Sequence, residues 1–199
     1  MALAPLTIAR LTLTILWGLL VVLLLFPILP QAARNGFVRL WSRALLWVLG
    51  VRVVLRGQGP ERRLARTGLS AEGVGMMLLA NHVSWLDVHA LTAVVPARLV
   101  AKVEISRWPV LGLLARASGT LFVERGRRHA VHAVNQKIAE HLRRGETIGV
   151  YPEGTTTDGS RLLPFHANLL QPALDAGAQV RPVALRYTQG GVRSEAAAY

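Results

Sequence analysis

A histidine and an aspartate stand five positions apart within residues 81–87 (Asn-His-Val-Ser-Trp-Leu-Asp), directly after the apolar run 76–80. An imidazole removes a proton from a substrate hydroxyl best when a carboxylate orients it and stabilises its charged form. Five residues correspond to about 500° of α-helix, so His82 and Asp87 would not share one face of a helix. A strand, a turn at His82 and a helix that opens near Ser84 would bring the two side chains together.

The same residues also fit a purely structural explanation. Ser84 and Asp87 have the spacing of a capping box, in which Ser84 is the N-cap and the helix dipole favours Asp87. On that alternative Asp87 begins a helix and His82 is only a turn residue. The segment alone leaves both explanations open, because short patterns of this kind recur by chance.

Two further polar clusters follow predicted strands, which is where open α/β sheets bind ligands. In residues 119–126, Arg125 comes just past a strand, and its planar guanidinium is suited to phosphate or carboxylate. The alternative is a solvated arginine in a basic loop. In residues 150–159, Glu153 precedes Gly154 and a run of threonines, which offer backbone access and hydroxyls to a polar head group or an oxyanion. The alternative there is a hydroxyl-rich turn without a ligand.

Apolar runs alternate with helical patterns along most of the chain. We expect strands near residues 51–55, 75–80, 99–103, 120–123, 148–151 and 179–186, and helices near residues 86–94, 110–117, 129–144 and 168–176. This alternation predicts an α/β fold with a mixed, largely parallel sheet flanked by helices.

The N-terminal quarter is typical of a membrane anchor. Residues 11–30 carry no charge and are long enough to cross a hydrocarbon core, while Pro27 and Pro30 end or kink that helix. Residues 36–49 read as an amphipathic interfacial helix. We expect an anchor over residues 1–50, either a spanning helix or a two-helix hairpin in one leaflet. A cleaved signal peptide is the alternative.

We expect a second domain over residues 51–199 after the anchor, and the absence of a stop signal near Tyr199 suggests that the natural chain continues. Arginines concentrate just after the apolar segment, so the positive-inside rule places this domain in the cytoplasm, as on a bacterial inner membrane. The net charge of +12 implies an anionic partner. Aromatic residues interleave with basic ones only beside the anchor, which favours anionic lipids over nucleic acid.

Two kinds of chemistry are not expected from the composition. The chain has no cysteine, which excludes a thiolate nucleophile and disulfides. His129 and His132 stand three apart on a predicted helix, but no cluster of carboxylates lies near them in the sequence, so we expect no metal site.

Four blocks in order resemble the glycerolipid acyltransferases of the lysophosphatidic acid acyltransferase family, over about residues 75–187. The family's Asn-His-x4-Asp block matches residues 81–87 and its Gly-x-x-Phe-x-x-Arg block matches residues 119–125. Its aromatic-Pro-Glu-Gly-Thr block matches residues 151–155, and its Val-x-Pro-Val block matches residues 180–183.

The resemblance implies a reaction and a site. His82 would be the general base and Asp87 its orienting group, while Arg125 and Glu153 would bind the polar head of a lysolipid acceptor. The pocket would include three neighbouring residues, Gly154, Thr155 and Thr156. The acyl donor would be a thioester of coenzyme A or acyl carrier protein, with no cofactor and no metal.

The acceptor is the less specific part of this resemblance. Lysophosphatidic acid is the expected acceptor, but many family members carry an arginine where this chain has Thr156. The variant resembles relatives that act on other lysolipids, including lyso-ornithine lipid, and Arg161 is placed to compensate for the missing charge. Two other functions fit parts of the sequence: a lipid-binding protein without catalysis, and a hydrolase that uses water as the acceptor.

Overall fold

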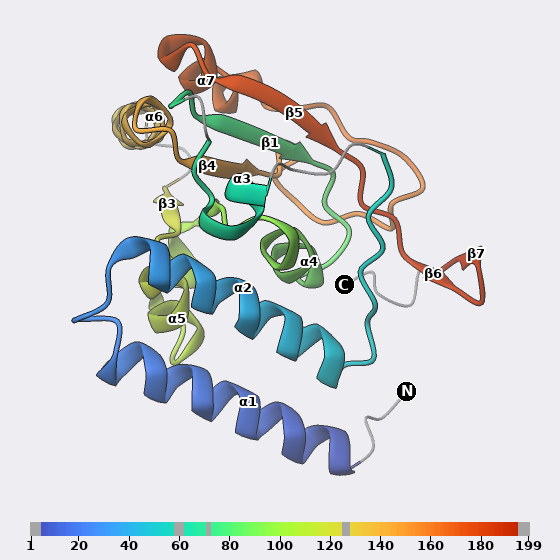
Figure 1. Cartoon of the computed structure of the whole chain (residues 1–199). Helices are drawn as coiled ribbons and strands as arrows, with labels where there is room; N and C mark the ends of the chain where they lie inside the picture. The colour runs from blue at the N-terminus through green and yellow to red at the C-terminus, as the bar shows by residue number, and fades with distance from the viewer. Residues whose placement is uncertain (1–4, 58–61, 71–72, 125–127, 195–199) are drawn as a thin grey trace.

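Five parallel strands form the central sheet of the computed structural model, in the order β3-β2-β4-β1-β5 (Figure 1). The structure describes residues 5–57, 62–70, 73–124 and 128–194. The strands are β1 Met76–Ala80, β2 Arg98–Lys102, β3 Leu121–Val123, β4 Thr147–Val150 and β5 Gln179–Val183. The predicted fold class is therefore confirmed, and the pairs within this sheet are all parallel.

Helices cover both faces of the sheet because β1 is apolar on both sides. Leu78 packs on one face with Leu91 and Leu99, while Met77 packs on the other with Ile138. Alternating side chains of a strand point to opposite faces, so an uninterrupted apolar run suits a strand buried on both. The helices are α3 Arg62–Thr67, α4 Leu86–Val94, α5 Leu111–Ala117, α6 Arg128–Arg143 and α7 Gln171–Ala176, with 3-10 turns at Val103–Arg107 and Ala167–Leu169.

Two expectations about strands are wrong. Residues 51–55 are extended but form no strand, because they run past α2 and α4 rather than along an edge of the sheet. Strand β5 stops at Val183 instead of continuing to residue 186, and Leu185 bonds to the Asn81 side chain. A small antiparallel pair that the sequence did not indicate follows, β6 Thr188–Gln189 and β7 Val192–Arg193.

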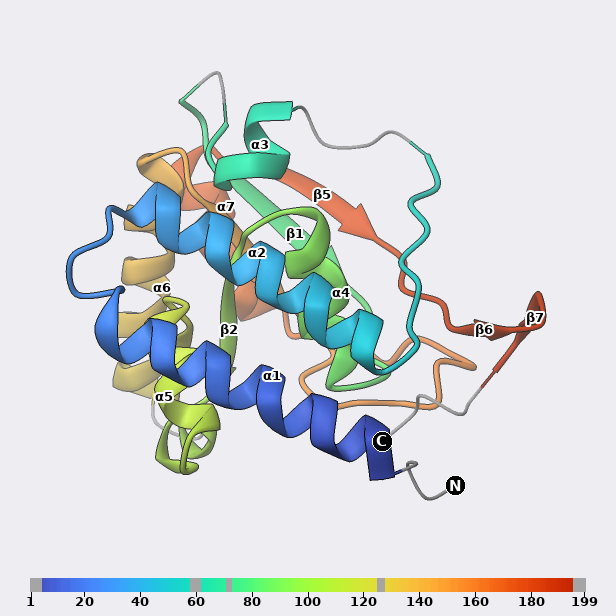
Figure 2. The same cartoon turned by 60° about the horizontal axis from the view of Figure 1, so that its bottom comes forward.

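The N-terminal region forms two antiparallel helices, α1 Pro5–Leu24 and α2 Gln31–Val48, which lie lengthwise against each other (Figures 1 and 2). Their close approach depends on Gly18, where an added Cβ would lie 2.4 Å from the Trp41 indole nitrogen. That nitrogen donates to the Thr14 carbonyl at 2.9 Å. A larger side chain at position 18 would separate the two helices.

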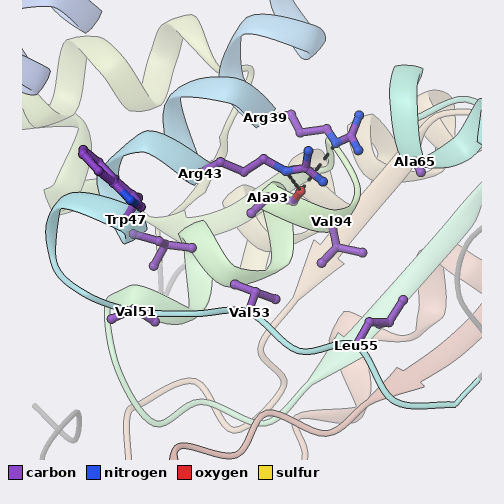
Figure 3. A pocket seen from close by; sticks show the side chains of 10 residues that line it. Arg39, Arg43, Trp47, Val51, Val53, Leu55, Ala65, Ala93 and Val94 are labelled. Carbon is purple, nitrogen blue, oxygen red and sulfur yellow. Dashed lines mark hydrogen bonds between the residues drawn. The ribbon is translucent and has the colours of Figure 1, made fainter.

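Helix α2 joins this hairpin to the rest of the molecule. Its Ser42 and Leu46 are buried, and Arg39 and Arg43 reach the C-terminal end of α4 (Figure 3). Helix α1 lies outside α2 and is the one helix in the described part of the chain that is long and apolar enough to cross a membrane. Its outer side leaves Leu13 and Leu20 more than half exposed.

The bounds of both anchor helices differ from the expected residues 11–30 and 36–49. Helix α1 begins at Pro5 because the charge of Arg10, which limits a membrane-spanning stretch, does not interrupt a helix. It ends at Leu24, ahead of Pro27, and α2 begins directly after Pro30. Proline disfavours helical backbone in the residue before it, which accounts for the break.

His89 is enclosed between α2 and α4. Its Nδ1 lies 3.3 Å from the Ser42 hydroxyl, and the rings of Trp41 and Trp85 meet it edge-on. Burial lowers the pKa of His89 from 6.5 to about 4, so the imidazole is neutral in the folded protein. Protonation of His89 therefore opposes the packing of α2 on α4.

Stability is expected to fall as the pH is lowered from about 6.5 toward 4. The unfolded chain binds a proton at position 89 in this window and the folded chain does not, so stability is complete above pH 6.5 and is progressively lost below it. The loss attributable to this group reaches at most about 3 kcal/mol. Thermal unfolding between pH 7.5 and 5 should show a weaker pH dependence for His89→Gln than for the unaltered protein. Equal slopes for the two proteins would contradict the burial argument.

Candidate active site

The polar residues of the site come together because β1 lies between β4 and β5. The carboxyl ends of parallel strands meet at one edge of a sheet, so the loops after these three strands are neighbours. His82 follows β1, Glu153 follows β4 and Tyr187 follows β5. Residues far apart in the sequence thereby surround one histidine.

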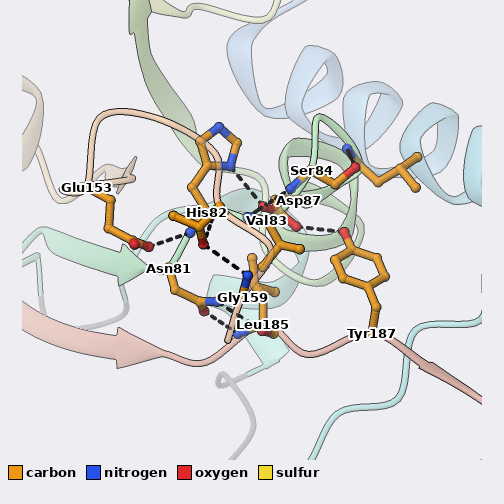
Figure 4. A network of polar contacts seen from close by, with 11 residues as sticks. Asn81, His82, Val83, Ser84, Asp87, Glu153, Gly159, Leu185 and Tyr187 are labelled. Atoms are coloured by element: carbon orange, nitrogen blue, oxygen red, sulfur yellow. Dashed lines mark hydrogen bonds and ion pairs between the residues drawn. The ribbon is translucent and has the colours of Figure 1, made fainter. Parts of the chain in front are cut away.

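His82 and Asp87 form the predicted pair, with Nδ1 of His82 2.8 Å from Oδ2 of Asp87 (Figure 4). The carboxylate is fully buried, whereas the His82 side chain is 20% exposed. An ionised carboxylate only accepts hydrogen bonds, so Nδ1 carries the proton that is shared with it. Nε2 lies on the ring edge that faces away from Asp87 and is the nitrogen left to accept a proton.

The turn between β1 and α4 is built around the same carboxylate. Oδ2 of Asp87 accepts hydrogen bonds from the backbone N–H groups of Val83 and Ser84 at 2.6 and 2.9 Å. The Ser84 hydroxyl in turn accepts from the Leu86 N–H at 3.3 Å. The expectation that Ser84 is the N-cap is wrong, because α4 begins at Leu86 and its N-cap is Trp85. Asp87 nevertheless lies in the first turn of α4, as the capping explanation expected, and it holds the imidazole as well.

Tyr187 completes the environment of Asp87 and was not expected from the sequence. Its hydroxyl donates to Oδ1 of Asp87 at 2.6 Å. Burial and the hydrogen bond to Asp87 raise the pKa of Tyr187 well above its usual value, so the phenol remains a donor. The sequence shows only a tyrosine shortly after the Val-x-Pro-Val block. Its place beside Asp87 follows from the pairing of β5 with β1.

Tyr151 forms the surface on which the imidazole rests. Its ring stacks on His82 with 4.2 Å between centroids and 20° between planes. Its hydroxyl is buried and has no hydrogen-bond partner among the described residues. Burial, with the nearby Asp87 and Tyr187, raises the pKa of this phenol, which stays neutral. The ring of Tyr151, rather than its hydroxyl, supports His82.

Tyr187→Phe should lower kcat by roughly tenfold and reduce stability by about 1–3 kcal/mol, because it leaves one buried carboxylate oxygen without a donor. Tyr151→Phe is the matched control, since it removes a phenolic hydroxyl that has no partner. Steady-state kinetics and thermal unfolding of both variants check this. Equal effects of the two substitutions would show that the Tyr187 hydrogen bond has no special role.

The carboxylate of Glu153 contacts the backbone of His82 and not its ring. One oxygen of its carboxylate accepts from the His82 N–H and the other from the Leu163 N–H, both at 2.9 Å. The residue is 4% exposed. Glu153 therefore ties the loop after β4 to the loop that carries His82. Its contact with the polar head of an acceptor stays a prediction.

The loop after Glu153 also holds the His82 backbone. The carbonyl of His82 accepts from the Thr157 N–H at 2.9 Å, and Gly154 adopts a left-handed conformation with φ of 70° that suits glycine. Thr155 is exposed and Thr156 is partly exposed in this loop. A substrate role for these three predicted pocket residues stays a prediction.

Arg125 lies outside the described residues. The strand before it, β3, stands three positions from β1 in the sheet, which corresponds to about 14 Å at the usual spacing of strands. Within the described ranges, no group of three histidine, aspartate or glutamate side chains is placed to hold a metal ion.

An imidazole backed by a buried carboxylate at the carboxyl ends of a parallel sheet is typical of α/β enzymes that use histidine as a general base. The family model described as Acyltransferase matches residues 52–186, which is more than half of the chain. The protein belongs to this acyltransferase family.

Named relatives divide between two acceptors. The chain is 48% identical over 113 residues to a 1-acyl-sn-glycerol-3-phosphate acyltransferase of Neisseria gonorrhoeae, covering 57% of this chain and 44% of that protein. It is 38% identical over 159 residues to a lyso-ornithine lipid O-acyltransferase of Pseudomonas aeruginosa, covering 80% of this chain and 57% of that protein. The chain therefore spans about half the length of these curated relatives.

A solved structure supports the fold. The crystal structure of the 1-acyl-sn-glycerophosphate acyltransferase PlsC from Thermotoga maritima matches with a TM-score of 0.61 and 21% identity. The match covers 87% of this chain and 73% of that one. At this identity the likeness shows the shared fold alone.

Proposed function

We propose that the protein transfers a fatty acyl group from a thioester of coenzyme A or acyl carrier protein to the free hydroxyl of a lysolipid. The observation that carries this proposal is the His82 ring itself. Its Nδ1 is held by a buried carboxylate, while its Nε2 has no protein partner in the described part of the chain. That arrangement suits a base that acts on an incoming hydroxyl.

The reaction follows from this geometry. Nε2 accepts the hydroxyl proton as the oxygen attacks the thioester carbonyl, which gives a tetrahedral oxyanion. The carbon–sulfur bond then breaks, the ester forms, and the departing thiolate receives the proton from the imidazolium. Asp87 stabilises the imidazolium between the two steps. Acyl transfer by this route needs no covalent enzyme intermediate.

Lysophosphatidic acid is the acceptor that we propose, with phosphatidic acid as the product. The support is the 48% identity to a relative with that name, together with the Gly-x-x-Phe-x-x-Arg block that ends at Arg125. Lyso-ornithine lipid is the second candidate. Thr156 in place of an arginine, and the larger share of the chain matched by the Pseudomonas relative, favour it.

One product analysis distinguishes these possibilities. Purified protein is incubated with lysophosphatidic acid or lyso-ornithine lipid, each with acyl-CoA and with acyl-ACP, and the lipids are identified by mass spectrometry. Phosphatidic acid formed by the unaltered protein and not by His82→Ala supports the proposal. Free fatty acid formed at the same rate without an acceptor indicates a hydrolase. No thioester turnover with any acceptor indicates a lipid-binding protein.

Arg125 is proposed to bind the acidic head of the acceptor. Arg125→Ala should raise the acceptor KM by about tenfold or more, because a charged hydrogen bond contributes roughly 1.5–3 kcal/mol, while kcat changes little. Initial rates over a range of acceptor concentrations measure this. An unchanged KM would remove Arg125 from the pocket.

The helical hairpin is proposed to sit in one leaflet of a bacterial inner membrane, with the α/β domain on the cytoplasmic side. Helix α1 packs lengthwise on α2, and α2 packs on α4, so α1 has one side against protein and leaves its outer side to contact lipid. A spanning helix would be surrounded by lipid. The arginines that follow the apolar segment favour the cytoplasmic side.

A further inference from the structure

A hollow lies at the opposite end of α4 from Asp87. It has a volume of about 500 Å³ and is formed by α2, the end of α4 and the extended segment after α2 (Figure 3). Ala93, which lines the hollow, comes six positions after Asp87 in α4, which is about 9 Å along the helix axis. None of the residues that line it belongs to the loops around His82.

Two arginines stand one helical turn apart at its edge. The Nε groups of Arg39 and Arg43 both donate to the Ala93 carbonyl, at 3.4 and 2.9 Å (Figure 3). Each guanidinium has five N–H groups, so most of the donors of both remain available. No carboxylate in the described part of the chain pairs with either arginine.

The capping of helix α4 explains the position of Arg43 but not that of Arg39. A cation near the last carbonyls of a helix is favourable, and Arg43 at 2.9 Å fulfils this role. The 3.4 Å contact of Arg39 lies beyond the usual range of such a bond. Burial and the neighbouring charge of Arg43 lower the pKa of Arg39, so the two guanidinium groups repel each other.

The rest of the hollow is apolar. Trp47, Val53 and Leu55 line it and are 73%, 40% and 55% exposed. A free inorganic anion gains nothing from such a wall, whereas an acyl chain does. The same α2 helix carries α1, whose exposed apolar side marks the face proposed to meet the membrane.

We propose that this hollow binds an anionic membrane phospholipid, with its phosphate between Arg39 and Arg43 and one acyl chain along Trp47, Val53 and Leu55. The guanidinium groups supply paired donors that match phosphate oxygens. The site is separate from the catalytic residues and does not depend on the acyl-transfer reaction. Lipid bound there would hold α2 and α4 together at the membrane surface.

Native mass spectrometry of the full chain released from nonionic detergent tests the proposal. The protein is titrated with phosphatidylglycerol, with phosphatidylcholine of the same chains, and with inorganic phosphate. Phosphatidylglycerol is anionic, but its phosphate is a diester, so it differs from the phosphate monoester of the proposed acceptor, lysophosphatidic acid. We expect the first phosphatidylglycerol to bind at least about tenfold more tightly than phosphatidylcholine, which corresponds to one charge-assisted contact.

Matched variants locate the binding. Arg39→Gln/Arg43→Gln should weaken phosphatidylglycerol binding by at least about tenfold. Arg52→Gln/Arg56→Gln removes the same amount of charge from two exposed arginines outside the hollow. This variant should bind phosphatidylglycerol as tightly as the unaltered protein does. If the first double variant unfolds, Arg39→Gln alone decides, because it leaves the Arg43 cap in place.

Three results would overturn the proposal. Equal loss of binding in the two double variants would mean attraction by net charge alone. Equal binding of phosphatidylcholine would mean an apolar groove without head-group recognition. Inorganic phosphate that competes at the same concentration as the lipid would mean a simple anion site.

Discussion

His82→Ala is expected to lower kcat for acyl transfer by at least about 10³-fold, because it removes the nitrogen that is proposed to accept the hydroxyl proton. The fold should survive. Asp87 keeps its hydrogen bonds from Val83, Ser84 and Tyr187 when the ring is gone. Rates from thioester release and product formation, with circular dichroism for the fold, provide the measurement.

His132→Ala is the matched control for this substitution. His132 is exposed on α6 and bonds to Gln136, so its removal deletes the same ring without touching the site. It should retain full activity. Activity of His82→Ala within about tenfold of the unaltered protein would eliminate His82 as the base, since base catalysis contributes about 10²–10⁴-fold.

Asp87→Asn is expected to lower kcat by about 10²-fold or more while the protein remains folded. The asparagine oxygen can occupy the position of Oδ2 and accept from Val83, Ser84 and His82, and its NH₂ group can donate to the Tyr187 hydroxyl. What is lost is the negative charge that stabilises the imidazolium.

Asp87→Ala should instead act on stability. It leaves the buried N–H groups of Val83 and Ser84 and the hydroxyl of Tyr187 without their acceptor, at a cost of about 3 kcal/mol or more. Denaturant unfolding and kinetics of the two variants separate the roles of charge and scaffold. An Asp87→Asn protein with kcat within twofold of normal would show that the charge has no catalytic role.

The His82–Asp87 contact could be expected from local residues as one of two explanations of the same segment. The spacing excludes a single helix, and the apolar run before it predicts a strand, so a strand–turn–helix segment was indicated without knowledge of the rest of the chain. The carboxylate then fits the turn because the N–H groups of Val83 and Ser84 point at it. Local geometry therefore accounts for this pair, whereas its contacts with Tyr151, Glu153 and Tyr187 depend on the strand order.

Tyr187 was not predictable for the opposite reason. It lies 100 positions from Asp87 in the sequence, and their contact depends on β5 pairing with β1. Apolar patterns indicate that strands exist but not which strand lies beside which. The tyrosine could be assigned only after the order of the strands was known.

Glu153 shows a second limit of sequence reasoning. Its position after a strand correctly indicated that it would approach His82, but the direction of its carboxylate depends on which N–H groups lack other partners. The loop brings the Leu163 N–H to the far oxygen, so the carboxylate is buried between two backbone groups. Residues 51–55, which were expected to form a strand, instead line the hollow beside α2 and α4.

A crystal structure of the protein with a bound lysolipid acceptor tests the central claim most directly. The account predicts that the free hydroxyl of the acceptor lies within about 3.2 Å of Nε2 of His82, while Nδ1 remains bonded to Asp87. A well-ordered acceptor whose hydroxyl lies against another surface, with Nε2 facing protein or solvent, would contradict the role of His82 as the base.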